Sequence, residues 1–116
     1  MMAFCLPERG TELQNSYHIA RQAMQFYSRE FGSYPFGSHK MVFVEDVITD
    51  VQNTSTLSIM SADALHPLYV IDQALKTRRL HAHALVVQWA GINIIERSWY
   101  ETWLINGLRL YLSGLF

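Results

Sequence analysis

Apolar residues recur every three or four positions in the N-terminal part of the chain, and this period predicts an amphipathic helix. Asn15 or Ser16 is suited to cap its start, because a short polar side chain can accept a hydrogen bond from the free N–H groups of a first turn. Gly32 predicts its end, since Pro35 disfavours continuation. The predicted buried stripe consists of Ala20, Ala23, Met24, Tyr27 and Phe31.

Short β-rich runs predict strands on both sides of this helix. Residues 41–44 predict a strand with Met41 and Phe43 on one face, and residues 57–60 predict a second strand. Residues 3–6, stopped by Pro7, predict a third. The polar stretches 8–14 and 46–56 are interpreted as loops.

Two further helices are predicted in the C-terminal half. Asp72 is expected to cap one that runs to about Gly91, and the series from Ser98 to Glu101 has the capping-box pattern that opens the other. The first carries Leu80, His83, Ala84, Val87 and Gly91 on one stripe, and the second carries Trp99, Trp103, Asn106 and Leu110. The expected fold class is therefore α+β, with three main helices and a small β-sheet.

Composition limits the classes of protein that fit. The 116 residues suffice for one domain, and half of them are apolar, which is enough for a core. Nine Lys and Arg against ten Asp and Glu give no broad basic face for nucleic acid. The single cysteine, Cys5, excludes an internal disulfide framework and is expected to be a small buried apolar group. Residues 84–95 are too short and too polar for a membrane span.

The most specific pattern runs from the second half of the helix that ends at about Gly91 into the last predicted helix. It matches the frame H-E-x-x-H-Q-W-x-G followed by W-x-x-x-W-L-N-E-G, and the chain therefore resembles the zinc aminopeptidases of the gluzincin type. The residues on the frame are Gln88, Trp89, Gly91, Trp99, Trp103, Leu104 and Gly107. The resemblance implies that residues 1–116 are the first half of a thermolysin-like catalytic domain, a fragment of a longer protein.

The same resemblance shows what has been replaced. The ligand positions of the family correspond to His83, Val87 and Asn106, and the position of its general base corresponds to Ala84. Catalytic zinc needs about three protein ligands and a water, and the bound water needs a base. One imidazole and one amide do not supply this set, so we expect no zinc, no other cofactor and no catalysis. His83 is then interpreted as a histidine on a buried helix face, bonded to a neighbour.

Other histidines offer no better ligand set. His81 and His83 are two apart, so on a helix they point in different directions. His39 and His66 lie in predicted loops without an acidic residue or cysteine at ligand spacing.

Lys76, Arg78 and Arg79 form the one cationic cluster with a functional interpretation. A solvated helix face is the simpler explanation. Cations in the first turns of a helix nevertheless oppose its dipole, and this makes them candidates to contact an acidic partner or a DNA phosphate.

Within the peptidase-like group the chain resembles the second subunit of the general transcription factor TFIID, a TATA-binding-protein-associated factor. The elements that carry this resemblance are Phe4-Cys5-Leu6-Pro7, Tyr34-Pro35, Leu65-His66 and Thr77-Arg78-Arg79. Residues 50–54 correspond to the G-A-M-E-N loop of active aminopeptidases but lack its glycine and glutamate. The resemblance implies a non-catalytic scaffold in the nucleus that binds other TFIID subunits, with core promoter DNA as a secondary candidate partner. It implies neither a membrane partner nor a small-molecule substrate. A zinc metallo-aminopeptidase, or a pseudo-enzyme that binds a metal or a peptide, remains the alternative.

Overall fold

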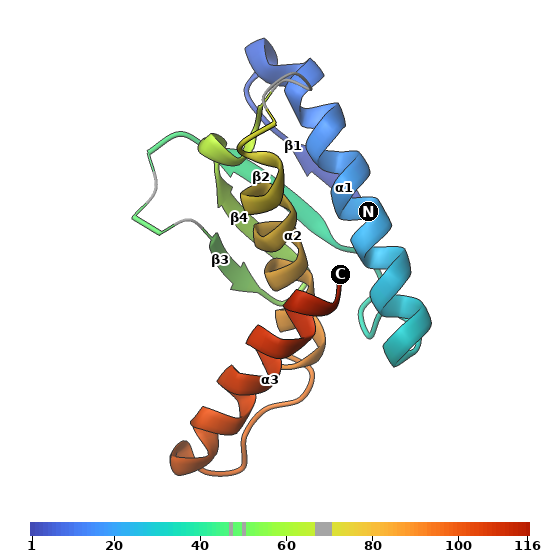
Figure 1. Ribbon diagram of the computed structural model, residues 1–116, viewed down its shortest axis with the longest axis vertical. Coiled ribbons are helices and arrows are strands. Elements are labelled where there is room, and N and C mark those ends of the chain that lie inside the picture. Colours follow the sequence, from blue (N-terminus) through green and yellow to red (C-terminus); the bar gives the residue numbers. More distant parts are fainter. Residues whose placement is uncertain (47, 50, 67–70) are drawn as a thin grey trace.

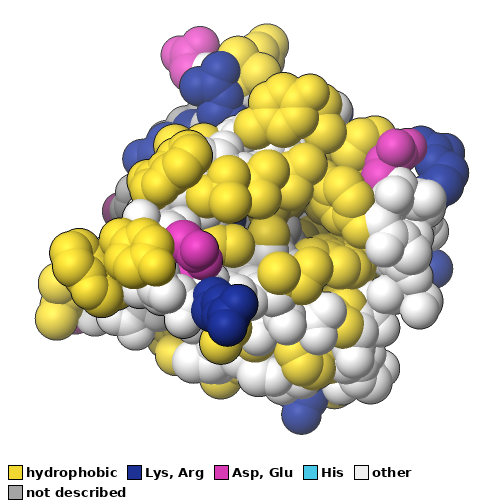
Figure 2. Space-filling model, turned by 90° about the horizontal axis from the view of Figure 1, so that it is seen from below, with side chains coloured by type: hydrophobic (Ala, Val, Ile, Leu, Met, Phe, Trp, Pro, Cys, Tyr) yellow, Lys and Arg dark blue, Asp and Glu magenta, His cyan; other side chains and the backbone are white. Residues whose placement is uncertain are grey.

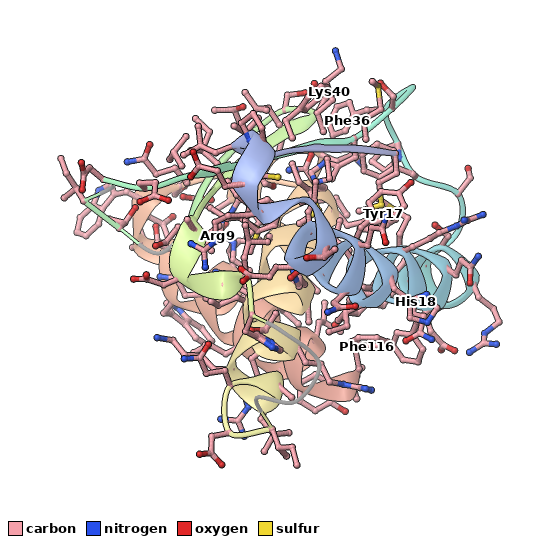
Figure 3. All side chains as sticks on the ribbon, turned by 90° about the horizontal axis from the view of Figure 1, so that it is seen from above. Arg9, Tyr17, His18, Phe36, Lys40 and Phe116 are labelled. Carbon is pink, nitrogen blue, oxygen red and sulfur yellow. The ribbon has the colours of Figure 1, made fainter. Side chains whose placement is uncertain are left out.

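The computed structural model describes residues 1–46, 48, 49, 51–66 and 71–116. Two helices, α1 (Gly10–Phe31) and α2 (Ala74–Trp89), lie side by side over one face of a four-stranded sheet. The third helix, α3 (Thr102–Leu115), begins beyond the end of α2 and away from the sheet, and it runs back so that its C-terminal end lies beside α2 and α1 (Figure 1). Seen from above, the sheet forms one layer and the helices lie beneath it (Figure 3). The predicted α+β class, with three helices and a small sheet, is confirmed.

The sheet has the order β1-β2-β4-β3. Strands β1 (Met2–Phe4), β2 (Lys40–Val44) and β4 (Leu57–Ser61) run parallel, and β3 (Val51–Thr54) pairs antiparallel with β4. Met41 and Phe43 are buried against the helices, as their alternation predicts. Strand β1 lies one or two residues earlier than residues 3–6.

The prediction of a loop at residues 46–56 was wrong, because β3 lies within it. This strand is at the edge of the sheet and is polar apart from Val51, so its sequence shows no apolar alternation that would predict a strand. Backbone bonding to β4 through the register Gln52 with Ile59 fixes it instead. Of the stretch 50–54 compared with an exopeptidase loop, Val51–Thr54 is thus an edge strand, and Asp50 lies outside the described residues.

Helix α1 begins earlier than predicted. A 3-10 turn at Pro7–Arg9 leads directly into Gly10, so the stretch 8–14 is helical rather than a loop. Ser16 does not cap the helix; its hydroxyl is buried and donates to the carbonyl of Ala64. The helix does end before Gly32, which has a φ of 94°. Glycine adopts this left-handed conformation without the steric penalty that a Cβ would bring.

Helix α2 begins with Gln73 rather than Asp72 at its N-cap, and no side-chain cap bond forms there. Its inner face builds the main core with α1. Buried side chains of this cluster are Ala23, Tyr27, Ala82, Leu85, Val86, Trp89 and Ala90. No helix in the described part of the chain is long and apolar enough to cross a membrane.

The predicted capping box before α3 does not form. Ser98 makes no side-chain bond to the following turn, and the carboxylate of Glu101 accepts from the N–H of Arg97 instead. A 3-10 turn at Trp99–Glu101 precedes the helix. The predicted stripe faces solvent: Trp99 is 84% and Trp103 73% exposed, whereas Ile105 is buried.

Candidate functional site

The four positions that the peptidase resemblance singles out come from α2 and α3, but they form no single cluster of donors. Ala84 and Val87 are buried, and their side chains are aliphatic. His83 is partly buried beside the groove between the two helices. Asn106 lies exposed on α3, and its side-chain oxygen accepts from Arg109 Nη1 at 3.3 Å. Among the described residues, no group of three or more His, Cys, Asp or Glu side chains is placed to hold a metal ion.

Arg109 supplies the polar link between these helices, and sequence analysis missed it. Its Nε donates to the carbonyl oxygen of Ala90 at 2.8 Å, at the C-terminal end of α2 where the helix dipole favours a cation. The guanidinium lies against Gly91, where an added Cβ would meet it at 2.4 Å. Burial, and then the charge of Arg109, lower the pKa of His83. The positive charge beside His83 at this junction is therefore the guanidinium of Arg109.

His81 and His83 point in different directions, as the helical spacing predicts. His81 is fully buried and packs edge-to-face against Phe43, with ring centroids 6.1 Å apart. Neither of its ring nitrogens has a hydrogen-bond partner among the described residues. Burial, together with the proximity of His66, lowers the pKa of His81 to about 4. The interpretation of His83 as a bonded core histidine was wrong, because it lies partly exposed and no bond to a described neighbour forms.

Gln88 organises a second polar cluster that sequence analysis did not foresee. This side chain is fully buried, and its Nε2 donates to the carbonyl of Thr54 at 3.0 Å. Its Oε1 accepts from the N–H of Thr56 and from the hydroxyl of Tyr34, each at 3.1 Å. Thr56 has a φ of 68°, which is unusual for a β-branched residue. Gln88 thus holds the strained β3–β4 turn against α2, a structural role for a residue on the peptidase-like frame.

His39 extends this cluster into the sheet. Its Nδ1 is 3.2 Å from the hydroxyl of Tyr34, and its Nε2 is 3.3 Å from the hydroxyl of Ser58. Burial, and then the amino-terminal charge, lower the pKa of His39 to about 4. The neutral ring is therefore the form that this fold holds. Cys5 is partly exposed rather than fully buried, although it packs against the neighbouring core.

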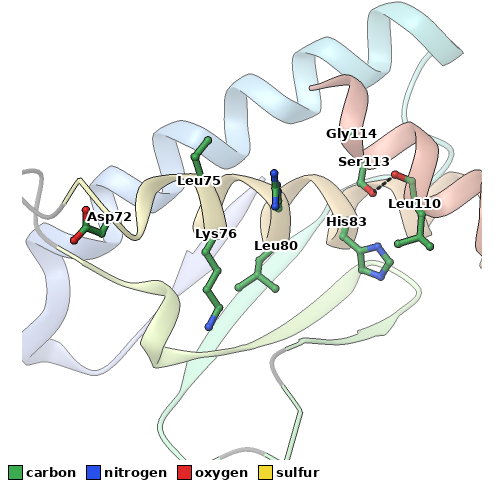
Figure 4. Close-up of a pocket in the computed structure, with 9 residues that line it drawn as sticks. Asp72, Leu75, Lys76, Leu80, His83, Leu110, Ser113 and Gly114 are labelled. Atoms are coloured by element: carbon green, nitrogen blue, oxygen red, sulfur yellow. Dashed lines mark hydrogen bonds between the residues drawn. The ribbon is translucent and has the colours of Figure 1, made fainter.

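A groove of about 680 Å³ separates α2 from the C-terminal half of α3. We call it the α2–α3 groove; its lining consists of Asp72, Leu75, Lys76, Arg79, Leu80, His83, Leu110, Ser113 and Gly114. Lys76, Leu80 and His83 project from one side of α2, with Leu110 on the facing helix (Figure 4). The groove thus brings His83 together with two of the three predicted contact cations, Lys76 and Arg79.

The predicted cation cluster is divided by the structure. Lys76 and Arg79 line the α2–α3 groove. Arg78 instead donates to the backbone oxygen of Phe116, with its guanidinium 4.0 Å from the centre of that ring. The cations that oppose the dipole of α2 therefore lie beside the C-terminal end of α3, where a helix dipole attracts positive charge.

Comparison with known proteins gives a consistent result. No protein-family model matches the chain. Proteins named Transcription initiation factor TFIID subunit 2 are similar to it: the one from Schizosaccharomyces pombe is 37% identical over 113 residues, which are 97% of this chain and 10% of that protein. The one from Drosophila melanogaster is 36% identical over 97% of this chain and 9% of its own length. The one from Saccharomyces cerevisiae is 35% identical over 94% of this chain and 8% of its own length. The chain spans about a tenth of the length of these relatives.

Proposed function

The chain belongs to the TFIID subunit 2 family, and from this premise we propose that it is part of a non-catalytic scaffold that serves transcription initiation in the nucleus. Its partners are the other TFIID subunits, and promoter DNA is a weaker second contact. No metal or other cofactor takes part.

The observation that carries this proposal is the chemistry of the former active-site positions. Ala84 cannot accept a proton, and Val87 offers methyl groups where the peptidase frame has a histidine. The Asn106 side chain is already bonded to Arg109, whose positive charge disfavours a metal cation nearby. A catalytic zinc site requires three protein ligands and an activated water, and these residues supply neither.

The surface of α3 supports a role in assembly. Figure 2 shows hydrophobic side chains gathered on the lower face of the molecule, the end at which α3 lies. Contiguous apolar surface of this kind is typical of protein interfaces. Exposed large apolar residues of α3 and its preceding turn are Trp99, Tyr100, Trp103, Leu104, Leu108, Leu110, Tyr111 and Leu115.

Metal content and peptidase activity test the non-catalytic part of the proposal. The full-length protein is purified, treated with a mild chelator, and measured for bound zinc and for hydrolysis of aminoacyl-p-nitroanilides. We expect neither. An active zinc aminopeptidase, measured in parallel, shows that both assays can detect such a site. One tightly held zinc in the parent protein, lost on His83→Ala, would overturn the proposal.

Assembly is tested in cells with an epitope-tagged full-length protein. Trp99→Asp and Trp103→Asp together are expected to reduce co-purification of other TFIID subunits, because a charge in an apolar interface costs desolvation energy. Gln25→Asp, at an exposed position on α1, is the matched control. Normal co-purification of the double variant would exclude this face from the assembly contacts.

The cations are tested in the same assay with Lys76→Glu, Arg78→Glu and Arg79→Glu combined. Three cations neutralise only about two or three phosphates, so the DNA contribution is small and insensitive to base sequence. We expect reduced incorporation with unchanged promoter affinity. Reduced promoter affinity with normal incorporation would assign the cluster to DNA instead.

A further inference from the structure

One complete face of α2 borders the α2–α3 groove. The groove residues that α2 and its N-terminal approach contribute follow the spacing i, i+3, i+4, i+7, i+8 and i+11, from Asp72 to His83. This is the repeat of a single helical face. The opposite face is buried in the fold through Thr77, His81, Leu85 and Gln88. Apart from Leu80, which also packs against the core beneath the sheet, the groove face of α2 lies outside the core clusters and borders the groove (Figure 4).

This face combines apolar surface with positive charge. Leu75 is 67% exposed, and Leu110 across the groove is 71% exposed. Lys76 and Arg79 line the same groove, and no ion pair among the described residues uses either cation. Asp72 is the acidic residue of the lining, and it lies at the end of the groove (Figure 4). The result is an apolar furrow edged by two unpaired cations.

We propose that the α2–α3 groove binds an acidic peptide segment whose apolar side chains enter the furrow between Leu80 and Leu110 while its carboxylates pair with Lys76 and Arg79. The proposal rests on the proposed scaffold function and specifies the chemistry of one partner. Apolar anchors in a groove with a charged rim give affinity through burial and orientation through charge.

A peptide fits this groove better than a nucleic acid. Two cations neutralise only about two phosphates, and Asp72 would repel the backbone. Arg78, the third cation, is engaged with Phe116. The leucines that line the groove offer nothing to a sugar–phosphate chain, whereas they match leucine or phenylalanine side chains.

The test uses fluorescence anisotropy with a labelled peptide of about twelve residues, in which a pair of leucines is flanked by aspartates and glutamates. It is measured against both the chain described here and the full-length protein. We expect saturable binding that weakens with added salt. Lys76→Glu with Arg79→Glu should weaken it by about tenfold or more. Leu110→Ser should weaken it several-fold without unfolding, because Leu110 is exposed.

Matched probes and variants isolate each contribution. Arg21→Glu, an exposed cation of α1 outside the groove lining, should leave peptide affinity unchanged. A peptide with lysines in place of its acidic residues, and one with serines in place of its leucines, should both bind poorly.

Four results would overturn the groove assignment. The first three are equal affinity for the acidic and basic peptides, tighter binding of a short DNA duplex that the same charge reversals abolish, and binding to the isolated chain that is absent from the full-length protein. Failure of the parent to bind the peptide, with normal TFIID co-purification, overturns this assignment alone. Peptide binding without TFIID co-purification overturns the proposed function instead.

Discussion

The sheet with α1 and α2 differs from α3 in how the apolar residues are used. In the first region they meet one another: Ala20, Tyr27, Met41 and Leu85 are all fully buried. In α3 most of the large apolar side chains face solvent instead. Ile105 is buried, and Leu112 packs against the core between α1 and α2. Polar bonds add to this contact, from Arg109 to the carbonyl of Ala90 and from the hydroxyl of Tyr27 to the carbonyl of Leu112 at 2.7 Å. Amphipathicity thus predicts that a helix has a partner surface, but not that the partner lies within the same stretch of chain.

The largest contrast is expected from placing the same charge in each region. Val87→Asp buries an unpaired carboxylate, so we expect it to lower the free energy of unfolding by about 3 kcal/mol or more. Trp103→Asp changes an exposed side chain and should have little effect on the isolated chain. Urea denaturation followed by circular dichroism measures both. A Val87→Asp variant as stable as the parent would show that this part of α2 is not packed as described.

Removal of the Gln88 amide should be nearly as severe. Gln88→Leu retains bulk but leaves the carbonyl of Thr54 and the N–H of Thr56 without their partner, at a cost of about 2–3 kcal/mol. Gln22→Leu, on the exposed face of α1, is the control. Hydrogen exchange at the Thr56 amide should accelerate in the first variant alone; unchanged protection there would contradict the proposed clamp on the β3–β4 turn.

Acidification should weaken the packed region through His39. Its folded pKa of about 4 lies below the ordinary value of 6.5, so between these values the unfolded chain binds more protons than the fold. Stability therefore falls as pH is lowered through this window, by about 2 kcal/mol between pH 7 and pH 5 from this group.

Denaturant titrations at several pH values measure this slope. His39→Gln should make it shallower, although buried His81 keeps a contribution of the same sign. His18→Gln, at an exposed position on α1, is the matched control. An unchanged slope in His39→Gln would show that His39 does not cause the pH dependence of stability.

The smallest expected changes in stability come from alanine substitutions at two glycines. Gly91 has a φ of 155° and touches the Arg109 guanidinium, so Gly91→Ala should cost about 1–2 kcal/mol through backbone strain and a weakened bond to Ala90. Gly107 lies within α3 with open space at its Cβ position, and Gly107→Ala should stabilise the chain by about 0.5–1 kcal/mol. Thermal melts of both variants suffice. Equal effects of the same sign would contradict the difference between the two positions.

Local chemistry predicted some elements and failed for others. Strand β2 and the end of α1 were predicted correctly, because burial alternation and Gly32 act through neighbouring residues. Strand β3 and the start of α1 were not, because backbone pairing with β4 and the turn at Pro7–Arg9 leave no apolar period. For the candidate site, the spacing correctly separated His81 from His83, whereas the roles of Gln88 and Arg109 depend on partners distant in sequence.

The sequence by itself determined the α+β class, the helical faces and the side-chain chemistry at His83, Ala84, Val87 and Asn106, since each follows from residue type and short-range periodicity. Only the tertiary structure decided which of those faces are covered. It placed Lys76 and Arg79 in a groove and Arg78 against Phe116, although all three lie within one turn of the helix. The physical reason is that burial and charge pairing depend on what packs across a helix, and α3 approaches α2 on one side alone.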